Sequence, residues 1–352
     1  RGLGDVYKRQ GQYFLNLYSG QHKWTGYTNL LPMPDYANRQ SDIERIITEI
    51  IDIKRWWFSL DETNLEYHGL IAQVMHGHHL GESLDQLQEK LTADYTRYQE
   101  LVKENDDLWM DLAEIEADSN FRATLNAYKS RRPYEELLSI DGASNGNVIN
   151  KQVMAQEIVM ELVGMAFGRW NIRYAAQPET IPPFGNVFDA LPFMPVVSFQ
   201  SEEAQLYPLT LPTDGILIGD DQHPDSLVKR VQEVMHSLWK NDADEMESEL
   251  CQLIGVDSLQ TYLESPNGFF DYHFKRYTKS RRKAPIYWPV SSPEGEITLW
   301  VYYPQLSSQT LPHLLLLLSK EHTAAQSDLT AAQLANDKNC LLYTSDAADD
   351  SS

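Results

Sequence analysis

The sequence predicts a predominantly helical α+β protein, in which a helical spacer is followed by a mixed α/β carboxy-terminal module. Across the first half of the chain, apolar residues recur every three or four positions, which is the period of an amphipathic helix. From Trp170 onward the pattern changes to proline-rich segments and short β-like runs. The chain has 352 residues and is 42% hydrophobic, so it is long and apolar enough to bury a core. We therefore expect one large or two modest folded domains.

Two amphipathic helices are predicted in the first half. Ser41 and Glu44 form a capping-box pattern, and isoleucines follow at helical spacing from Ile43 toward Trp57. A second capping-box pattern, Ser83 with Gln86, opens a longer helix. The apolar face of this longer helix consists of Leu84, Leu87, Leu91, Tyr95, Tyr98 and Val102. Both segments carry charged residues between the apolar positions, as expected of helices with one solvated face.

The second half predicts both helices and strands. Val153–Phe167 is apolar nearly all round, which is typical of a buried helix. A helix is expected to begin near Pro224, and a shorter one to end at Gly255. Short strands are expected at Gly215–Ile218 and, as a hairpin, at Ile286–Val290 and Ile297–Tyr303. The apolar face of the helix after Pro224 is formed by Leu227, Val228, Val231, Val234 and Leu238.

The two ends of the chain are expected to be foreign to the protein. Asp5–Gln10 reads DVYKRQ, which GAT GTG TAT AAG AGA CAG encodes, and Cys340–Ser345 reads CLLYTS, which TGT CTC TTA TAC ACA TCT encodes. These two stretches lie on opposite strands of one short DNA sequence that resembles a transposase-derived sequencing adapter. We therefore interpret residues 1–10 and 340–352 as artefact, and residues 11–339 as a fragment of a longer protein.

The charge distribution predicts one local site for a polyanion. The net charge of −22 argues against general nucleic-acid binding, because phosphate attraction requires a positive field. Six cations nevertheless fall within nine residues, and the aromatic residues Tyr277, Tyr287 and Trp288 lie among or near them. The alternative is that these cations pair with carboxylates, while Tyr287 and Trp288 pack in the core. The candidate DNA-binding residues are Lys275, Arg276, Lys279, Arg281, Arg282 and Lys283.

Other classes of site are not predicted. Cys251 is the one cysteine within residues 11–339, so no internal disulfide is expected and a reducing, cytoplasmic setting fits. The apolar run Leu314–Leu318 is far shorter than the roughly 20 residues that cross a bilayer. A metal site is not expected either, because the nearby histidines have no acidic or thiol partner at regular spacing. These histidines are His68, His76, His78 and His79.

Four ordered segments resemble one family. Gly268–Val290, GFFDYHFKRYTKSRRKAPIYWPV, resembles a segment near the carboxy-terminal end of PglX-type adenine-specific DNA methyltransferases of BREX phage-defence systems. A shorter version with an Arg-Pro-Ile-Tyr-Trp core occurs in the related single-chain type IIG restriction-modification enzymes. Three further segments, which are Ala166–Tyr174, Asp214–Trp239 and Ile297–Leu306, also resemble the family and appear in its order.

The resemblance implies a parent enzyme that methylates adenine N6 at specific sites in double-stranded DNA, with S-adenosylmethionine as its cofactor. It divides the chain into the end of a target-recognition region with its following helix (11–60), a helical spacer (61–150), a carboxy-terminal α/β module (151–320) and a tail (321–339). Other subunits of the defence system are further candidate partners, and no membrane partner is implied.

The chemical machinery of that family is not expected in this fragment. Adenine methylation needs a Gly-rich cofactor turn and an [Asn/Asp]-Pro-Pro-[Tyr/Phe] loop that grips the flipped base. Thr180–Phe184 imitates this loop, but Ile181 occupies its polar position and cannot accept the amino hydrogen. We therefore expect no methyltransferase Rossmann-like domain, no catalytic or cofactor-binding residues, and no activity of the fragment alone. The alternative function is a non-catalytic scaffold that docks other proteins of the defence complex.

Overall fold

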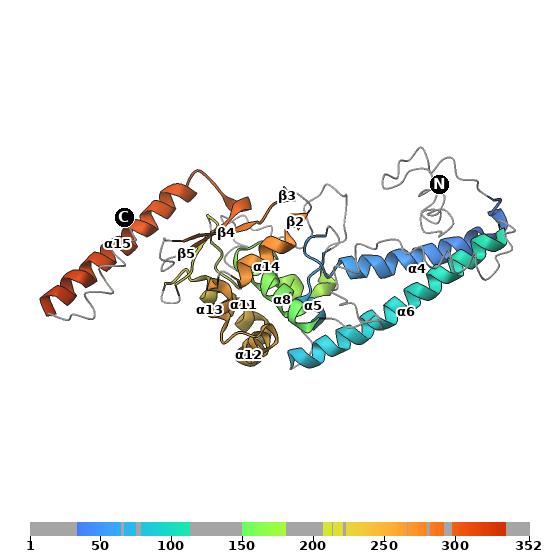
Figure 1. The fold of residues 1–352 in the computed structure, drawn as a ribbon, viewed down its shortest axis with the longest axis horizontal. Coiled ribbons are helices and arrows are strands. Elements are labelled where there is room, and N and C mark those ends of the chain that lie inside the picture. Colours follow the sequence, from blue (N-terminus) through green and yellow to red (C-terminus); the bar gives the residue numbers. More distant parts are fainter. Residues whose placement is uncertain are drawn as a thin grey trace. The chain divides into compact units, whose positions relative to one another are not determined.

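The computed structural model describes most of the chain between residues 34 and 335, with gaps (Figure 1). The described residues are 34–64, 67–74, 79–112, 150–180, 207–212, 214–220, 223–265, 267–279, 282–291 and 298–335. The chain divides into two compact units: Arg1–Tyr67 with Asp85–Asn150, and His68–Leu84 with Lys151–Ser352. The described part is predominantly helical with a small antiparallel sheet, which confirms the coarse fold class.

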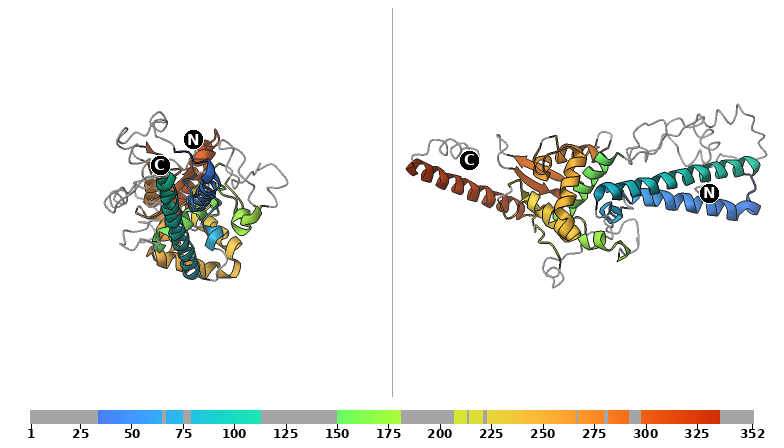
Figure 2. Two further views of the ribbon diagram at one scale, coloured as in Figure 1. Left: turned by 90° about the vertical axis from the view of Figure 1, so that its right-hand side faces the viewer. Right: turned by 90° about the horizontal axis from the view of Figure 1, so that it is seen from below.

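Two long helices form the described core of the first unit, the second of them from Asp85 onward. After the short 3₁₀ turn η1 (Ala37–Arg39), α4 (Gln40–Phe58) lies alongside α6 (Leu80–Leu112), as Figures 1 and 2 show. The Trp57 ring of α4 lies 5.4 Å from the Tyr98 ring of α6 in an edge-on arrangement. The buried apolar residues along this pair include Ile46, Ile50, Trp57, Leu87, Leu91, Tyr98 and Leu101. Both predicted helices are therefore confirmed, with their predicted apolar faces.

The predicted capping boxes are wrong in detail. Ser41 and Ser83 both lie inside their helices, because α4 begins at Gln40 and α6 begins at Leu80. Ser83 donates its hydroxyl hydrogen to the His79 carbonyl instead of capping an amide. For α6, the Glu249 carboxylate accepts from the Gly81 amide at 3.0 Å. A carboxylate distant in sequence thus accepts from an amide at the start of α6 that the predicted Ser83–Gln86 box does not involve.

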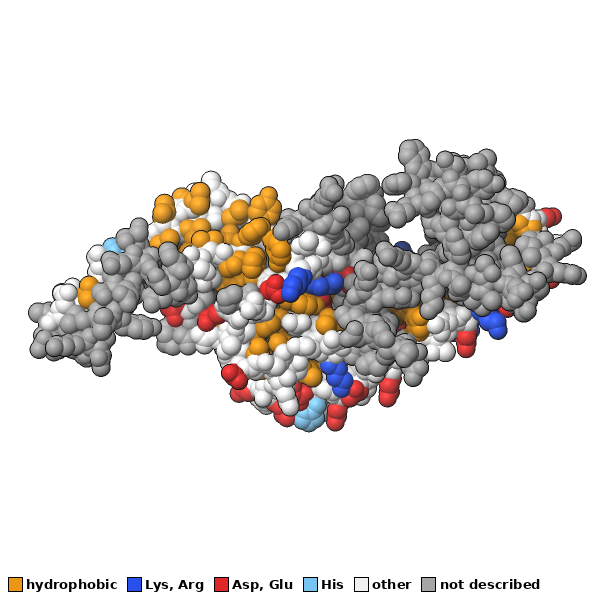
Figure 3. Space-filling model, in the orientation of Figure 1, with side chains coloured by type: hydrophobic (Ala, Val, Ile, Leu, Met, Phe, Trp, Pro, Cys, Tyr) orange, Lys and Arg blue, Asp and Glu red, His pale blue; other side chains and the backbone are white. Residues whose placement is uncertain are grey.

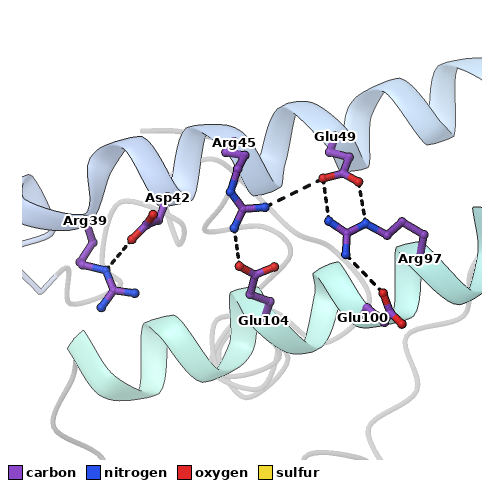
Figure 4. Close-up of polar contacts among 7 residues, drawn as sticks. All are labelled: Arg39, Asp42, Arg45, Glu49, Arg97, Glu100 and Glu104. Atoms are coloured by element: carbon purple, nitrogen blue, oxygen red, sulfur yellow. Dashed lines mark hydrogen bonds and ion pairs between the residues drawn. The ribbon is translucent and has the colours of Figure 1, made fainter.

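A row of ion pairs joins α4 to α6 on their solvated side (Figure 4). Arg97 binds Glu49 through two bonds, Nε to Oε1 at 2.6 Å and Nη2 to Oε2 at 3.0 Å, and it also reaches Glu100 at 3.2 Å. Arg45 pairs with Glu104 across the same interface. Arg45, Glu100 and Glu104 are exposed, and Glu49 and Arg97 are partly exposed, so the pairs contribute little to stability. Ion pairs between helices act more on orientation and pairing than on stability.

Three helices pack against one another in the second unit. They are α8 (Lys151–Ala166), α11 (Leu227–Trp239) and α12 (Ala243–Ile254). From Met154 to Ala166 every residue of α8 except Gln156 is buried, as its uniform hydrophobicity predicts. The predicted apolar face of α11 is buried, and its N-cap is Ser226, whose hydroxyl accepts from the Lys229 amide. Gly255 ends α12 in the left-handed conformation, with φ of 84°, as predicted.

An antiparallel sheet completes this unit. Its strand order is β1 (Ile216–Ile218), β5 (Thr298–Tyr302) and β4 (Tyr287–Ser291), and the register from Tyr287 opposite Tyr302 to Ser291 opposite Thr298 confirms the predicted β4–β5 pairing. Helix α14 (Phe269–Arg276) contacts both β4 and α8. Aromatic rings fill the space between them, with centroid separations of 5.2–6.0 Å among Phe167, Phe269, Tyr287, Trp300 and Tyr302.

The last described element is a long helix that the sequence analysis missed. Helix α15 (Thr310–Ala335) includes the Leu314–Leu318 run and most of the segment expected to be a tail. Leu317 packs against Ile216, Ile218 and Leu299 of the sheet, so tertiary contact holds the start of this helix. Among the described residues, no helix is both long enough and apolar enough to span a bilayer.

The remaining elements are short. They are α5 (Ile71–Val74), α9 (Ile172–Ala176), η2 (Pro178–Thr180), η3 (Lys240–Asp242), α13 (Leu259–Glu264), the two-residue strands β2 (Thr278–Lys279) and β3 (Arg282–Lys283), and η4 (Tyr303–Gln305).

Candidate nucleic-acid interface

The described residues of the predicted basic segment form the end of α14 and two short paired strands. Strands β2 and β3 are antiparallel, with Thr278 opposite Lys283 and Lys279 opposite Arg282. Arg281 lies outside the described residues, and the side chains of Lys279, Arg282 and Lys283 are not described either. The backbone thus brings three of the six candidate cations onto two neighbouring strands. We call residues 278–283 the basic hairpin.

The base of the basic hairpin is fixed by hydrogen bonds. The Ala284 amide donates to the Tyr277 carbonyl at 3.3 Å, which joins the two ends of the hairpin. The Thr278 hydroxyl donates to the Phe274 carbonyl at 2.6 Å, and Arg169 donates to the Tyr277 hydroxyl at 2.6 Å. The Arg169 guanidinium also lies over the Trp170 ring, 4.1 Å from its centroid. The hairpin therefore extends from an ordered support.

His273 links α14 to the start of β4. Its side chain is fully buried, and its Nε2 atom accepts from the Ile286 amide at 2.9 Å and the Tyr287 amide at 3.3 Å. Burial, and then the positive charge of Arg169, lower the pKa of His273 to about 3. The imidazole is therefore neutral at physiological pH, with Nε2 as the acceptor. Sequence reasoning did not single out this residue, although it lies within Gly268–Val290.

Two candidate cations with described side chains are paired within the chain. Arg276 forms an ion pair with Glu157 of α8, with Nε 2.5 Å from Oε1, and the Glu157 side chain is only 7% exposed. Tyr272 donates its hydroxyl hydrogen to the same carboxylate. Lys275 pairs with Asp271 at 2.5 Å on the exposed side of α14. Arg276 therefore fits the alternative interpretation, in which a cation of the basic segment pairs with a carboxylate of the chain. Its ion pair joins α14 to α8.

The two aromatic residues that follow the hairpin lie in different surroundings. Tyr287 is fully buried, with its ring 5.4 Å from that of Tyr302, so it packs in the core as the alternative interpretation holds. Trp288 is 44% exposed, and its indole nitrogen donates to the Pro285 carbonyl at 3.1 Å. Only Trp288 of this pair presents aromatic surface to solvent.

A groove between α6 and Arg39 of η1 has the wrong charge for phosphate. It has a volume of about 530 Å³ and is lined by four carboxylates and two cations. Its lining residues are Arg39, Glu100, Lys103, Glu104, Asp107, Leu108 and Asp111. The charge balance there repels a polyanion, so among the described residues the basic hairpin is the better candidate.

The second unit also brings acidic partners to one of the histidines. His79 Nδ1 lies 2.9 Å from Glu249 Oε1 and 3.4 Å from Glu245 Oε1, and both glutamates belong to α12. The hydrogen bond to Glu249, followed by the charge of Glu245, raises the pKa of His79. No regular spacing in the sequence reveals these two partners of His79, because both lie more than 160 positions away. His76 and His78 lie outside the described residues.

The segment Thr180–Phe184, which imitates the adenine-gripping loop in sequence, lies almost entirely outside the described residues. Thr180 ends η2, and Ile181–Phe184 are outside the described residues. Neither a known family model nor a curated protein sequence matches this chain.

Proposed function

We propose that this chain is the DNA-engaging and structural carboxy-terminal part of a site-specific adenine-N6 DNA methyltransferase of a phage-defence or restriction-modification system. The sequence support is the four ordered segments that resemble the PglX-type enzymes. The structural observation that carries the proposal is the basic hairpin, which concentrates cations on an anchored support in an otherwise acidic chain.

The register of the hairpin favours an anionic partner. Lys279 lies opposite Arg282 in the antiparallel pair. Like charges directly opposite each other destabilise a β-ladder, and two-stranded ribbons are only marginally stable. Contact of cations with DNA phosphates releases counterions from the DNA and favours binding. Contacts of this kind position a protein on the duplex, while base-specific contacts are assigned to the target-recognition region.

In this proposal the methyl transfer takes place elsewhere in the parent enzyme. S-adenosylmethionine and the base-gripping loop belong to that other part, and this chain alone is inactive. Double-stranded DNA is its principal partner, and the cytoplasm is its location.

Charge reversal in the basic hairpin tests the proposal. The double variant R281E/R282E is expected to bind a short DNA duplex at least tenfold more weakly than the unmodified chain. It is also expected to reduce the slope of log affinity against log salt concentration by about 2, since each lost phosphate contact removes about 0.9. Fluorescence anisotropy over a series of salt concentrations measures both quantities.

A matched control carries the same charge change at exposed lysines of the same unit. Lys229 and Lys240 are exposed, on α11 and at its end. The variant K229E/K240E should change DNA affinity much less than R281E/R282E. If both double variants bind the duplex with equal affinity and equal salt dependence, the hairpin has no special role in DNA binding.

The scaffold alternative is favoured by one surface. Figure 3 shows hydrophobic side chains gathered over the start of α15 and the neighbouring sheet. Leu311, Leu315 and Leu316 of α15 are 70%, 68% and 51% exposed. Exposed apolar surface of this kind is common at protein contacts. Retention of other defence-complex subunits by the chain, with no retention of DNA, would support this alternative over the first.

A further inference from the structure

Three potential metal ligands converge near the start of α6. Glu245 and Glu249 are four residues apart on α12, a spacing that places both on one face of a helix. His79 directly precedes the first residue of α6. One ligand atom from each of the three side chains lies within 4.8 Å of the other two. All three residues belong to the second unit.

We propose that His79, Glu245 and Glu249 bind one divalent transition-metal ion, with zinc as the principal candidate. Imidazole nitrogen and carboxylate oxygen are both ligands of zinc, at about 2.0–2.2 Å. Two ligands of one ion are then separated by up to about 4 Å, so the observed cluster needs only a small contraction. The His79 and Glu245 side chains are 48% and 58% exposed and can make this adjustment by rotating.

The surroundings of Glu249 already resemble an outer coordination shell. Its Oε2 atom accepts from the Gly81 amide at 3.0 Å, while its Oε1 atom faces His79. A ligating carboxylate commonly holds its second oxygen in a hydrogen bond of this kind, which fixes its orientation toward the ion. Glu249 is the least exposed member, with 22% of its side chain accessible. Water would occupy the remaining coordination positions on the open side.

The charge balance also favours an ion over a simple ion pair. Two carboxylates face one imidazole, so the cluster is negative even when His79 carries a proton. A divalent cation neutralises both carboxylates and ties residues 79–81 to α12. The site is separate from the basic hairpin, so its existence does not depend on DNA binding.

Zinc titration of the full, untagged 352-residue chain tests the site. Isothermal titration calorimetry should show binding to the unmodified chain, and the melting temperature should rise with zinc concentration. The variant Glu245→Gln should lower zinc affinity by about tenfold or more. Glu245 is chosen because its carboxylate is not the one that caps α6.

Asp244→Asn is the matched control, since it removes the same charge from the neighbouring position of α12. Asp244 is 90% exposed and lies 3.7 Å from His236, outside the cluster. This variant should bind zinc as the unmodified chain does. His79→Asn provides a second test, because asparagine retains a favourable residue at the start of α6 while it removes the imidazole.

Cobalt gives a spectroscopic readout. Bound Co²⁺ should produce visible absorption bands in the unmodified chain and in Asp244→Asn, and these bands should be lost in His79→Asn. The proposal is overturned if zinc leaves the melting temperature of the unmodified chain unchanged, or if Glu245→Gln and His79→Asn retain its zinc affinity.

Discussion

Replacement of Glu161 by alanine is expected to lower the free energy of unfolding by roughly 2–5 kcal/mol. Glu161 is only 2% exposed, and its Oε2 atom accepts from the Leu70 amide at 2.7 Å and the Ile71 amide at 2.8 Å. Leu70 and Ile71 are themselves buried, so alanine would leave both donors without this acceptor and without access to water. Urea denaturation followed by tryptophan fluorescence measures the loss.

Glu161→Gln is the control for this prediction. Glutamine keeps an oxygen acceptor of similar reach, so it should lose much less stability than alanine. Amide hydrogen exchange of residues 67–74 should accelerate in Glu161→Ala and change less in Glu161→Gln. Equal stability of the two variants would show that the hydrogen bonds from the Leu70 and Ile71 amides contribute little to the free energy of unfolding.

Gly69 belongs to the same arrangement. Its φ of 95° is in the left-handed region, and a Cβ atom there would lie 2.6 Å from Glu161 Oε1. Glycine at this position therefore allows the chain to turn into α5 while the carboxylate approaches the backbone.

The second large effect is a pH dependence of the free energy of unfolding, caused by His273. Its folded-state pKa of about 3 is below the ordinary value of 6.5, so the unfolded chain binds this proton more readily. Stability from this group is fully present above about pH 6.5 and is lost as the pH falls toward 3. The expected slope is about 1.4 kcal/mol per pH unit within that window. Denaturant unfolding between pH 7 and pH 4 measures it.

His273→Gln separates this titration from that of the other groups. A glutamine oxygen can accept from the Ile286 and Tyr287 amides but does not take up a proton in this range. The variant should therefore lose stability less steeply than the unmodified chain as the pH falls. Parallel pH profiles for the two proteins would contradict the assignment of His273 as a buried, neutral acceptor.

Local sequence patterns predicted the elements whose buried faces or ends depend on residues close together in the chain. The uniform hydrophobicity of Val153–Phe167, the apolar face of α11 and the left-handed Gly255 are all confirmed. These features follow from helical periodicity and from the conformational freedom of glycine, both of which act over a few residues. The β4–β5 pairing was also predictable, because its strands are close in sequence.

Contacts between distant parts of the chain could not be predicted in this way. Glu249 meets Gly81 from 168 positions away, and Glu157 meets Tyr272 from 115 positions away. Such pairs leave no periodic signal in a single sequence. The start of α15 was missed for a related reason, since the consecutive leucines of Leu314–Leu318 have no helical period and Leu317 acquires its role from the sheet.

The roles of the cations in the basic segment also depend on contacts that the sequence alone does not show. In sequence, Arg276 is indistinguishable from its basic neighbours, yet it pairs with the nearly buried Glu157 carboxylate. Lys279 and Arg282 differ from it because they lie opposite each other on the hairpin. Only the fold separates a cation that holds α14 to α8 from cations that remain candidates for phosphate contact.

Our proposal that the chain is part of an adenine methyltransferase is tested most directly by sequencing the genomic DNA upstream of the region that encodes residue 11. We expect the reading frame to continue upstream and to encode a Gly-rich turn after a strand and an Asn-Pro-Pro-Tyr loop. A frame that begins near Gly11, with no methyl-donor pocket encoded ahead of it, would contradict the account.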